Sequence, residues 1–314
     1  MVHQKYGYSP PMLNKFKGCL FGVAVGDALG APVEGLSREK IAARFGWISD
    51  YIINPKKKRI ALGQWTDDTA LTMATAASLV EKQAVNLEDI TEKMRFAFQF
   101  HENRGYGITT RKALSGDRRG KSGLRSSNGV AMRIAPIALY SSSNLDELRT
   151  NVELIGRITH QNQDSIDAAL GVAFAIASAV RGELQPPRLI QRTIAFLGRT
   201  DMSAKLMEAE DILNFEPSKT TIEGLDYIGT QGNALETVGS AFYAFLRTPG
   251  NFRESVTHAV NAGGDCDTVA SVTGAISGSY NGFEGIPKKW VNNVEMRTEI
   301  DELSHLLYQA AALR

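Results

Sequence analysis

Two short acidic stretches, far apart in the chain, carry the side chains with the clearest chemistry in this sequence. The first is Thr66-Asp67-Asp68-Thr69, and the second is Gly263-Gly264-Asp265-Cys266-Asp267-Thr268. Each opens a helical pattern, so each is predicted to lie at a helix N-terminus. If the two helix starts meet, four aspartates come together, which is tolerated only with protons or a cation between them. Oxygen ligands without histidine or paired cysteine favour Mg²⁺ or Mn²⁺. The stretches therefore predict a carboxylate-rich site for two divalent cations.

Helix capping is the alternative explanation for either stretch alone. Aspartate and threonine at a helix start accept hydrogen bonds from free backbone N–H groups, and each such cap is worth about 0.5–2 kcal/mol. Capping accounts well for one stretch, whereas two in the same chain favour the metal site.

Glycines spaced four residues apart mark the helices that would bring the two stretches together. One series is Gly18, Gly22, Gly26 and Gly30, and the other is Gly274, Gly278 and Gly282. Each glycine inside a helix costs about 0.5–1 kcal/mol relative to alanine, and close packing of a second helix would offset that cost. We expect the two glycine faces to lie against each other in the core. The alternative is that several of these glycines mark turns.

Glu34 follows the first glycine-faced segment, on a turn made by Pro32 and Gly35. An isolated glutamate in a loop is usually solvated, but this position makes Glu34 a candidate catalytic carboxylate. The basic run at residues 56–59 is typical of a solvated surface loop, and it could also attract an acidic partner.

A second polar region begins with a basic, glycine-rich stretch, residues 111–125, and leads to Ser126-Ser127-Asn128-Gly129. A small polar turn that opens a helix can direct backbone N–H groups at a phosphate, although Asn-Gly is also a common turn. His160 ends a later helical pattern. It either complements the helix dipole or contacts a ligand.

Helical periodicity dominates the rest of the chain and predicts an all-α fold. Apolar stripes are expected over residues 87–98, 145–155, 189–197 and 300–310, with a minor hairpin at residues 47–53. The 314 residues, 43% of them hydrophobic, are predicted to form one domain at 16–314, preceded by an irregular arm at 1–15. The apolar run at 168–180 is too short to span a bilayer and is predicted to be a buried helix.

The charge, the cysteines and the N-terminus together argue against a nucleic-acid-binding, membrane-binding or secreted protein. A net charge of +1 indicates no preference for nucleic acid or for an anionic membrane. The two cysteines, Cys19 and Cys266, form no spaced framework, and the N-terminus lacks the apolar region of a signal peptide. We therefore expect a cytoplasmic protein.

Taken together, the motifs resemble the ADP-ribosylglycohydrolase family, which includes dinitrogenase-reductase-activating glycohydrolase and the ADP-ribosyl-acceptor hydrolases. The resemblance covers Phe16 to about Trp290, and its pieces occur in the family's order. They are Gly26-Asp27-Ala28-Leu29-Gly30 with Glu34, Trp65-Thr66-Asp67-Asp68-Thr69, Asn128-Gly129 with Met132-Arg133, Thr159-His160, Gly263-Gly264-Asp265-Cys266-Asp267-Thr268, and Gly285-Ile286-Pro287 with Trp290.

The resemblance implies a compact, single-domain, all-α orthogonal bundle with a cleft that holds two Mg²⁺ or Mn²⁺ ions. By matching positions, the metal ligands would be Thr66, Asp67, Asp68, Asp265, Asp267 and Thr268, and Glu34 would be the catalytic glutamate. Asn128, Gly129 and His160 would line the ADP-ribose cleft. Ser127, where many relatives have glycine, and Gly232-Asn233-Ala234, which lacks an aromatic residue, depart from the pattern and leave the acceptor open.

The function implied by the resemblance is metal-dependent removal of ADP-ribose from an ADP-ribosylated protein, with ADP-ribosyl-arginine as the expected linkage and serine or a small-molecule ester as alternatives. Two further functions remain open. One is another two-metal hydrolase such as a phosphoesterase, because clustered aspartates serve phosphoryl chemistry equally well. The other is an immunity protein that uses its N-terminal arm to block an ADP-ribosyltransferase toxin, or that reverses the toxin's action.

Overall fold

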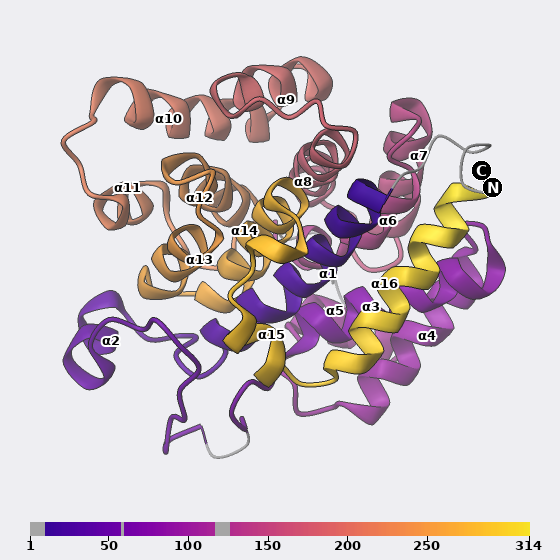
Figure 1. Ribbon diagram of the computed structural model, residues 1–314, viewed down its shortest axis with the longest axis horizontal. Coiled ribbons are helices and arrows are strands. Elements are labelled where there is room, and N and C mark those ends of the chain that lie inside the picture. Colours follow the sequence, from indigo (N-terminus) through magenta and orange to yellow (C-terminus); the bar gives the residue numbers. More distant parts are fainter. Residues whose placement is uncertain (1–9, 58–59, 117–125) are drawn as a thin grey trace.

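The computed structural model describes residues 10–57, 60–116 and 126–314, and this part of the chain is built from helices. It contains 16 α-helices, three short 3₁₀ helices and no strands, so the predicted all-α class is confirmed (Figure 1). Four helices predicted from apolar periodicity are present as α4 (Leu87–Phe100), α7 (Leu145–Gly156), α9 (Leu189–Leu197) and α16 (Arg297–Ala312).

Two antiparallel helices, α1 (Pro10–Gly30) and α14 (Cys266–Asn281), form the centre of the molecule. Their glycine faces touch, as predicted. A Cβ atom added to Gly22 would lie 2.0 Å from the carbonyl oxygen of Gly274, and one added to Gly18 would lie 2.1 Å from that of Gly278. No side chain fits between the two backbones at these positions. The C-terminus of α1 therefore lies beside the N-terminus of α14, where a Cβ on Gly30 would meet Asp267 Cα at 2.3 Å.

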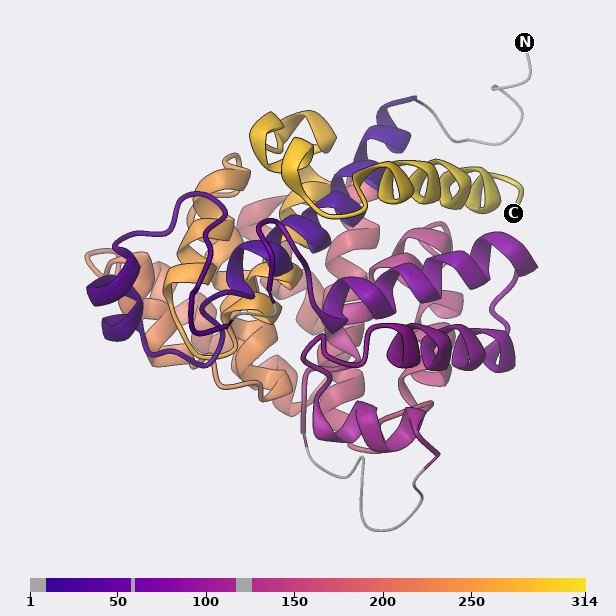
Figure 2. The same cartoon turned by 90° about the horizontal axis from the view of Figure 1, so that it is seen from below.

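Two groups of helices cover this central pair. On one side, α3 (Asp67–Lys82) packs against α4 and α16, and the two purple helices α3 and α4 run side by side in Figure 2. On the other side, α8 (Gln163–Val180), α12 (Ala234–Arg247) and α13 (Phe252–Asn261) pack against α14. The remaining elements are α2 (Arg38–Phe45), α5 (Ile108–Leu114), η1 (Ala131–Arg133), α6 (Ala135–Tyr140), η2 (Pro186–Arg188), α10 (Asp201–Phe215), α11 (Thr221–Ile228), η3 (Phe283–Gly285) and α15 (Lys288–Asn293).

Helix α8 contains the apolar run that we predicted to be a buried helix. By length and composition alone it could cross a membrane, but 89% of it is buried inside the structure. Residues 165–180 are all buried, in contact with α6, α7, α12 and α14. The prediction of a core helix is confirmed.

Residues 10–15, which we predicted to belong to an irregular arm, are part of helix α1 (Pro10–Gly30). Helix α1 begins at Pro10, because two successive prolines suit the first turn of a helix, where no backbone N–H partner is needed. Lys15 Nζ donates a hydrogen bond of 2.5 Å to the carbonyl oxygen of Ala179, and Phe16 packs edge-on against Tyr308. Residues 10–15 therefore belong to the helical body, and residues 1–9 lie outside the described residues.

The predicted hairpin at residues 47–53 is wrong, because this stretch is irregular. Its backbone finds a side-chain partner instead of a second strand. Asn261 on α13 accepts a hydrogen bond from the Ile48 N–H at 2.9 Å and donates one to the Ile48 carbonyl at 2.8 Å. A single buried amide thus replaces the pairing of a strand.

Candidate functional site

The turn that carries Glu34 is tied to the second acidic stretch by backbone hydrogen bonds. The Gly35 N–H donates to the Gly264 carbonyl, and the Gly264 N–H donates to the Leu36 carbonyl, both at 2.8 Å. Gly263 and Gly264 have positive φ angles, and a Cβ on Gly264 would lie 2.3 Å from the Thr230 carbonyl oxygen. The two glycines therefore allow the sharp, crowded turn that places Asp265 next to Glu34.

The first acidic stretch is held in place by Asp27, a buried aspartate on α1. Its carboxylate accepts hydrogen bonds from the backbone N–H groups of Thr66 and Thr69, at 2.9–3.0 Å, and from their hydroxyls, at 2.8 and 2.6 Å. Burial raises the pKa of Asp27 to about 6 in spite of these bonds. Asp27 thereby caps α3 from a neighbouring helix and brings the N-terminus of α3 to the C-terminal end of α1.

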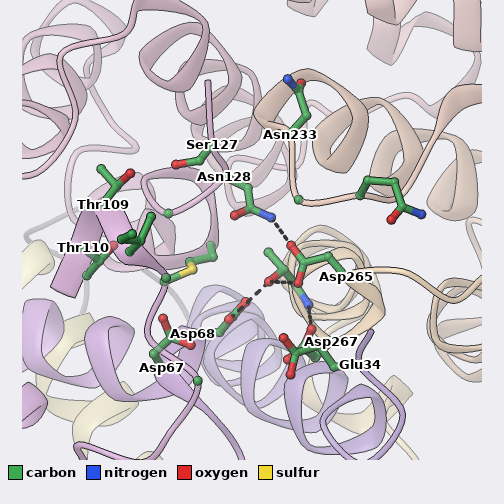
Figure 3. Close-up of a pocket in the computed structure, with 18 of the residues that line it drawn as sticks. Glu34, Asp67, Asp68, Thr109, Thr110, Ser127, Asn128, Asn233, Asp265 and Asp267 are labelled. Atoms are coloured by element: carbon green, nitrogen blue, oxygen red, sulfur yellow. Dashed lines mark hydrogen bonds between the residues drawn. The ribbon is translucent and has the colours of Figure 1, made fainter. Parts of the chain in front are cut away.

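Both acidic stretches and Glu34 line one pocket of about 580 Å³ (Figure 3). Single ligand oxygens of Glu34, Asp265 and Asp267 lie within 4.8 Å of one another. The hydroxyl of Thr268 links the two stretches, because it lies 3.4 Å from Asp68 Oδ2 and 3.2 Å from Asp265 Oδ1. The convergence predicted from sequence is therefore present.

Simple capping does not account for the two stretches. The N-cap residues of α3 and α14, Thr66 and Asp265, make no side-chain capping bond to their own helices. Asp267 makes one local bond, accepting from the Thr268 N–H at 3.0 Å. Asp265 and Asp267 line the pocket, and the Thr66 hydroxyl donates to Asp27.

The electrostatics of the pocket are unfavourable without a counter-charge. Burial, followed by repulsion from neighbouring carboxylates, raises the pKa values of Asp67, Asp68 and Asp267 well above their usual range. Burial also raises the pKa of Asp265, although a hydrogen bond from Asn128 opposes the shift. These carboxyl groups either keep protons or share a cation.

The donor set fits hard divalent cations. Among the described residues it consists of carboxylate and hydroxyl oxygens, and Asp68 Oδ1 is buried with no hydrogen-bond partner. A buried carboxylate oxygen without a partner is costly, and coordination to Mg²⁺ or Mn²⁺ would satisfy it. Thr66 does not line the pocket, but its hydroxyl donates to Asp27, which leaves the oxygen lone pairs free to bind a cation.

The opposite wall of the pocket is neutral and rich in hydroxyl and amide groups. Among the described residues that line the pocket there is no lysine or arginine. The polar groups of this wall come from Thr109, Thr110, Ser126, Ser127, Asn128, Gly129, Gln231 and Asn233, and Ile108 and Met132 also line the pocket. The pocket thus has an acidic end for cations and a hydrogen-bonding end for a polar ligand.

The three predicted substrate-binding residues differ in their placement. Gly129 lines the pocket. Asn128 also lines it, but both of its amide hydrogens are used inside the protein, in bonds to Asp265 Oδ2 at 2.5 Å and to Thr237 Oγ1 at 2.9 Å. Asn128 therefore orients Asp265, and only its carbonyl oxygen remains for a ligand.

His160 is fully buried behind the pocket wall and does not line it. A Cβ on Gly129 would lie 2.9 Å from His160 Cε1, so the absence of a side chain at Gly129 leaves room for the ring. Burial, with a smaller contribution from Arg133, lowers the pKa of His160 to about 3. Both ring nitrogens contact hydroxyl groups, those of Thr159 and Ser127, which together with the lowered pKa favours a neutral ring over a charged histidine that complements the helix dipole.

Some residues in or beside the pocket have no role in the site predicted from sequence. Asp27 could have been found, because an aspartate inside an apolar, glycine-faced helix must be paired when buried. The sequence does not indicate that Thr109 and Thr110 line the pocket, because a threonine pair at a helix start is common. Lys57, from the basic run, contacts Glu34 Oε2 at 3.0 Å, while Lys58, Arg59 and residues 117–125 lie outside the described residues.

Comparison with known proteins agrees with this geometry. A family model described as ADP-ribosylglycohydrolase matches residues 9–314. The chain is 34% identical over 306 residues to an uncharacterised protein of Archaeoglobus fulgidus, covering 95% of this chain and 97% of that protein. It is 27% identical to the ADP-ribosylhydrolase ARH3 of Bos taurus, covering 95% and 93%, and 25% identical to the ADP-ribosylarginine hydrolase Tri1 of Serratia proteamaculans, covering 95% and 80%.

A solved ADP-ribosylglycohydrolase-related protein complex superposes with a TM-score of 0.76 at 26% identity, covering 96% of this chain and 100% of that chain. The match spans both halves of the pocket, from Glu34 to Thr268, and includes the helices that position them. The chain therefore belongs to the ADP-ribosylglycohydrolase family, a family of hydrolases that act on ADP-ribosylated substrates.

Proposed function

We propose that this protein is a metal-dependent hydrolase that removes ADP-ribose from ADP-ribosyl-arginine on protein. The observation that carries the proposal is the buried group of carboxylates that faces a neutral hydroxyl and amide wall across one pocket. A volume of about 580 Å³ suits a ligand of nucleotide-sugar size. The arginine linkage is supported by the similarity to Tri1, whose name specifies ADP-ribosylarginine.

The residues that would hold the cations are Thr66, Asp67, Asp68, Asp265, Asp267 and Thr268, with Glu34 beside them. Bound cations would supply positive charge that orients ribose hydroxyls and makes a water molecule more acidic. Asn128 holds Asp265 in position, and Asp27 holds the start of α3, so that both halves of the donor set are fixed before a ligand enters. A site assembled in advance does not have to be ordered during the reaction.

Hydrolysis breaks the bond between the anomeric carbon of the ribose and the guanidino nitrogen, adds the oxygen of water to that carbon and returns a proton to the nitrogen. Positive charge grows on the ribose in the transition state. Glu34 is half-buried at the edge of the carboxylate group, where it can stabilise that charge or transfer the proton. Lys57 Nζ, 3.0 Å from Glu34 Oε2 and 3.0 Å from the Ala31 carbonyl, holds the carboxylate at this edge.

The test is release of free ADP-ribose from arginine-linked and serine-linked ADP-ribosylated proteins, with Mg²⁺ or Mn²⁺ and again with a chelator. We expect release from the arginine linkage that depends on the metal. The Glu34→Gln variant should lose turnover while still binding ADP-ribose, whereas Glu39→Gln, at an exposed carboxylate on α2, should match the wild type.

Each other result contradicts a defined part of the proposal. Release of ADP-ribose from the serine-linked protein alone would show that the proposed arginine linkage is wrong, while the proposed reaction class would stand. Full release of ADP-ribose in the presence of chelator would show that the proposed metal dependence is wrong. Failure to release ADP-ribose from either substrate, with hydrolysis of a phosphate ester instead, would overturn the reaction class.

A further inference from the structure

A row of four polar side chains runs from the protein interior to the pocket wall. Arg133 Nη2 donates to Thr159 Oγ1, Thr159 Oγ1 contacts His160 Nδ1, and His160 Nε2 contacts Ser127 Oγ, each over 2.7 Å. Arg133 and His160 are completely buried, and Thr159 is 5% exposed. None of these contacts belongs to the carboxylate group.

Only one donor-to-acceptor order along this row gives the buried hydrogen atom of the Thr159 hydroxyl an acceptor. An arginine side chain donates and never accepts, so one lone pair of Thr159 Oγ1 is occupied by Arg133. Among the described residues, His160 Nδ1 is the acceptor within reach of the Thr159 hydroxyl hydrogen. If Nδ1 carried the proton instead, that buried hydroxyl hydrogen would have no acceptor, which is unfavourable.

The imidazole is neutral and carries a single proton. With Nδ1 accepting from Thr159, the proton must be on Nε2, from which it is donated to Ser127 Oγ. The Ser127 hydroxyl therefore accepts a hydrogen bond from inside the protein, and within the described part of the chain its own hydrogen has no acceptor.

The position of Ser127 is fixed by a second contact. The Ser165 hydroxyl accepts from the Ser127 N–H at 3.0 Å and donates to the Ser127 carbonyl at 2.8 Å, which attaches this loop to α8. Ser127 lines the pocket, and in Figure 3 it lies with Thr109 across the pocket from Glu34 and Asp267. The free donor is thus held at the neutral end of the pocket.

We propose that Ser127 is a binding residue that donates a hydrogen bond to an anionic oxygen of the ligand's diphosphate, and that His160 and Thr159 are positioning residues that set the direction of this bond. The inference rests on the proposed function, because that function supplies the diphosphate. An oriented donor that has no acceptor among the described residues matches a group that only accepts, and bonds to charged oxygens are stronger than neutral ones. The diphosphate would lie away from the carboxylates, which repel it.

The first test measures ADP-ribose affinity by titration calorimetry on the full chain saturated with Mg²⁺. Ser127→Ala should bind roughly tenfold more weakly, or worse, because it removes a hydrogen bond to a charged group. Thr159→Val should show a similar loss although it does not touch the ligand, and Thr159→Ser should restore the affinity. Ser304→Ala, whose hydroxyl bonds to the Ile300 carbonyl in α16, is the control and should bind as the wild type does. Mn²⁺ affinity should be unchanged in all four variants.

The second test reads the histidine itself. Nitrogen-15 NMR of the imidazole, assigned by the signal missing in His160→Gln, should report the Nε2–H tautomer in the wild type. The Nδ1–H tautomer would overturn the proposed direction, whether or not the protein is active.

The outcomes separate this inference from the function on which it rests. If the wild type binds ADP-ribose and folded Ser127→Ala binds it equally well, the role of Ser127 is overturned and the function stands. If the wild type binds no ADP-ribose, the proposed function fails, and the ligand named for Ser127 fails with it. A loss in Ser127→Ala that Thr159→Val does not share would overturn the positioning role of Thr159.

Discussion

Replacing Gly22 by alanine tests whether the contact between α1 and α14 builds the site. Gly22 faces Gly274 across the helix pair, and an added Cβ would lie 2.0 Å from the Gly274 carbonyl oxygen and 2.6 Å from its carbonyl carbon. An ordinary contact begins near 3.4 Å, so the two backbones must separate locally by about 1.4 Å. The neighbouring atoms are helix backbone, which cannot rotate away as a flexible side chain can.

The expected effect is a loss of stability combined with weaker metal binding. Overpacking a core contact costs about 1–3 kcal/mol, while alanine regains about 0.5–1 kcal/mol of helix preference. Because the clash is with backbone, we expect a net loss of about 2 kcal/mol in the free energy of unfolding. The same displacement moves Glu34 away from Asp265 and Asp267, so Mn²⁺ affinity should fall by about tenfold.

Urea denaturation of metal-free protein followed by circular dichroism measures the first effect, and calorimetric titration with Mn²⁺ measures the second. Gly171→Ala in α8 is the matched control, because there an added Cβ would meet its nearest neighbour, Thr193 Cγ2, at 3.7 Å, an ordinary contact. That variant should be more stable than the wild type by up to about 1 kcal/mol, with unchanged metal affinity. The reasoning is refuted if Gly22→Ala is as stable as the wild type, or if the two variants behave alike.

Two further predictions concern the buried carboxylates. In metal-free protein burial raises the pKa values of these groups, repulsion between carboxylates raises those of Asp67 and Asp267 further, and the pKa of Asp27 is raised to about 6. The folded state therefore binds more protons than the unfolded state, and the stability this contributes is lost as the pH rises from about 4 through 6 and beyond. Urea denaturation with chelator should show lower stability near pH 8 than near pH 5, with Mg²⁺ reducing the difference, and equal stability at both pH values would contradict the shifts. Asp68→Asn should stabilise the metal-free protein near pH 8 by about 1 kcal/mol, because one buried charge is removed, while Mn²⁺ affinity falls more than about tenfold. If metal-free Asp68→Asn were less stable than the wild type, the charge of Asp68 would not destabilise the folded protein as we expect.

Much of the fold could be predicted because it depends on local periodicity. A helix buries one face, so the spacing of apolar residues identifies α4, α7, α9 and α16 without knowledge of their neighbours. Glycines four apart likewise report that something packs closely on that face, and a second series with the same spacing identified its partner. The errors fell where a local signal had two structural outcomes. Pro10-Pro11 fits an irregular arm as well as a first helical turn, and the pattern at residues 47–53 suits a strand although Asn261 satisfies its backbone.

The candidate site shows the same division. The sequence by itself determined the oxygen-rich donor set, its position at two helix starts and the glycine faces that could bring those starts together. Each of these features depends only on the types and spacing of residues within one short stretch of the chain. Only the tertiary structure decided that Asp27 holds the start of α3, that Asn128 bonds to Asp265, and that His160 contacts Ser127 from behind the wall. Those roles depend on which distant side chain supplies the partner of a buried polar group. That choice is made by helix packing, which no single stretch of the chain encodes.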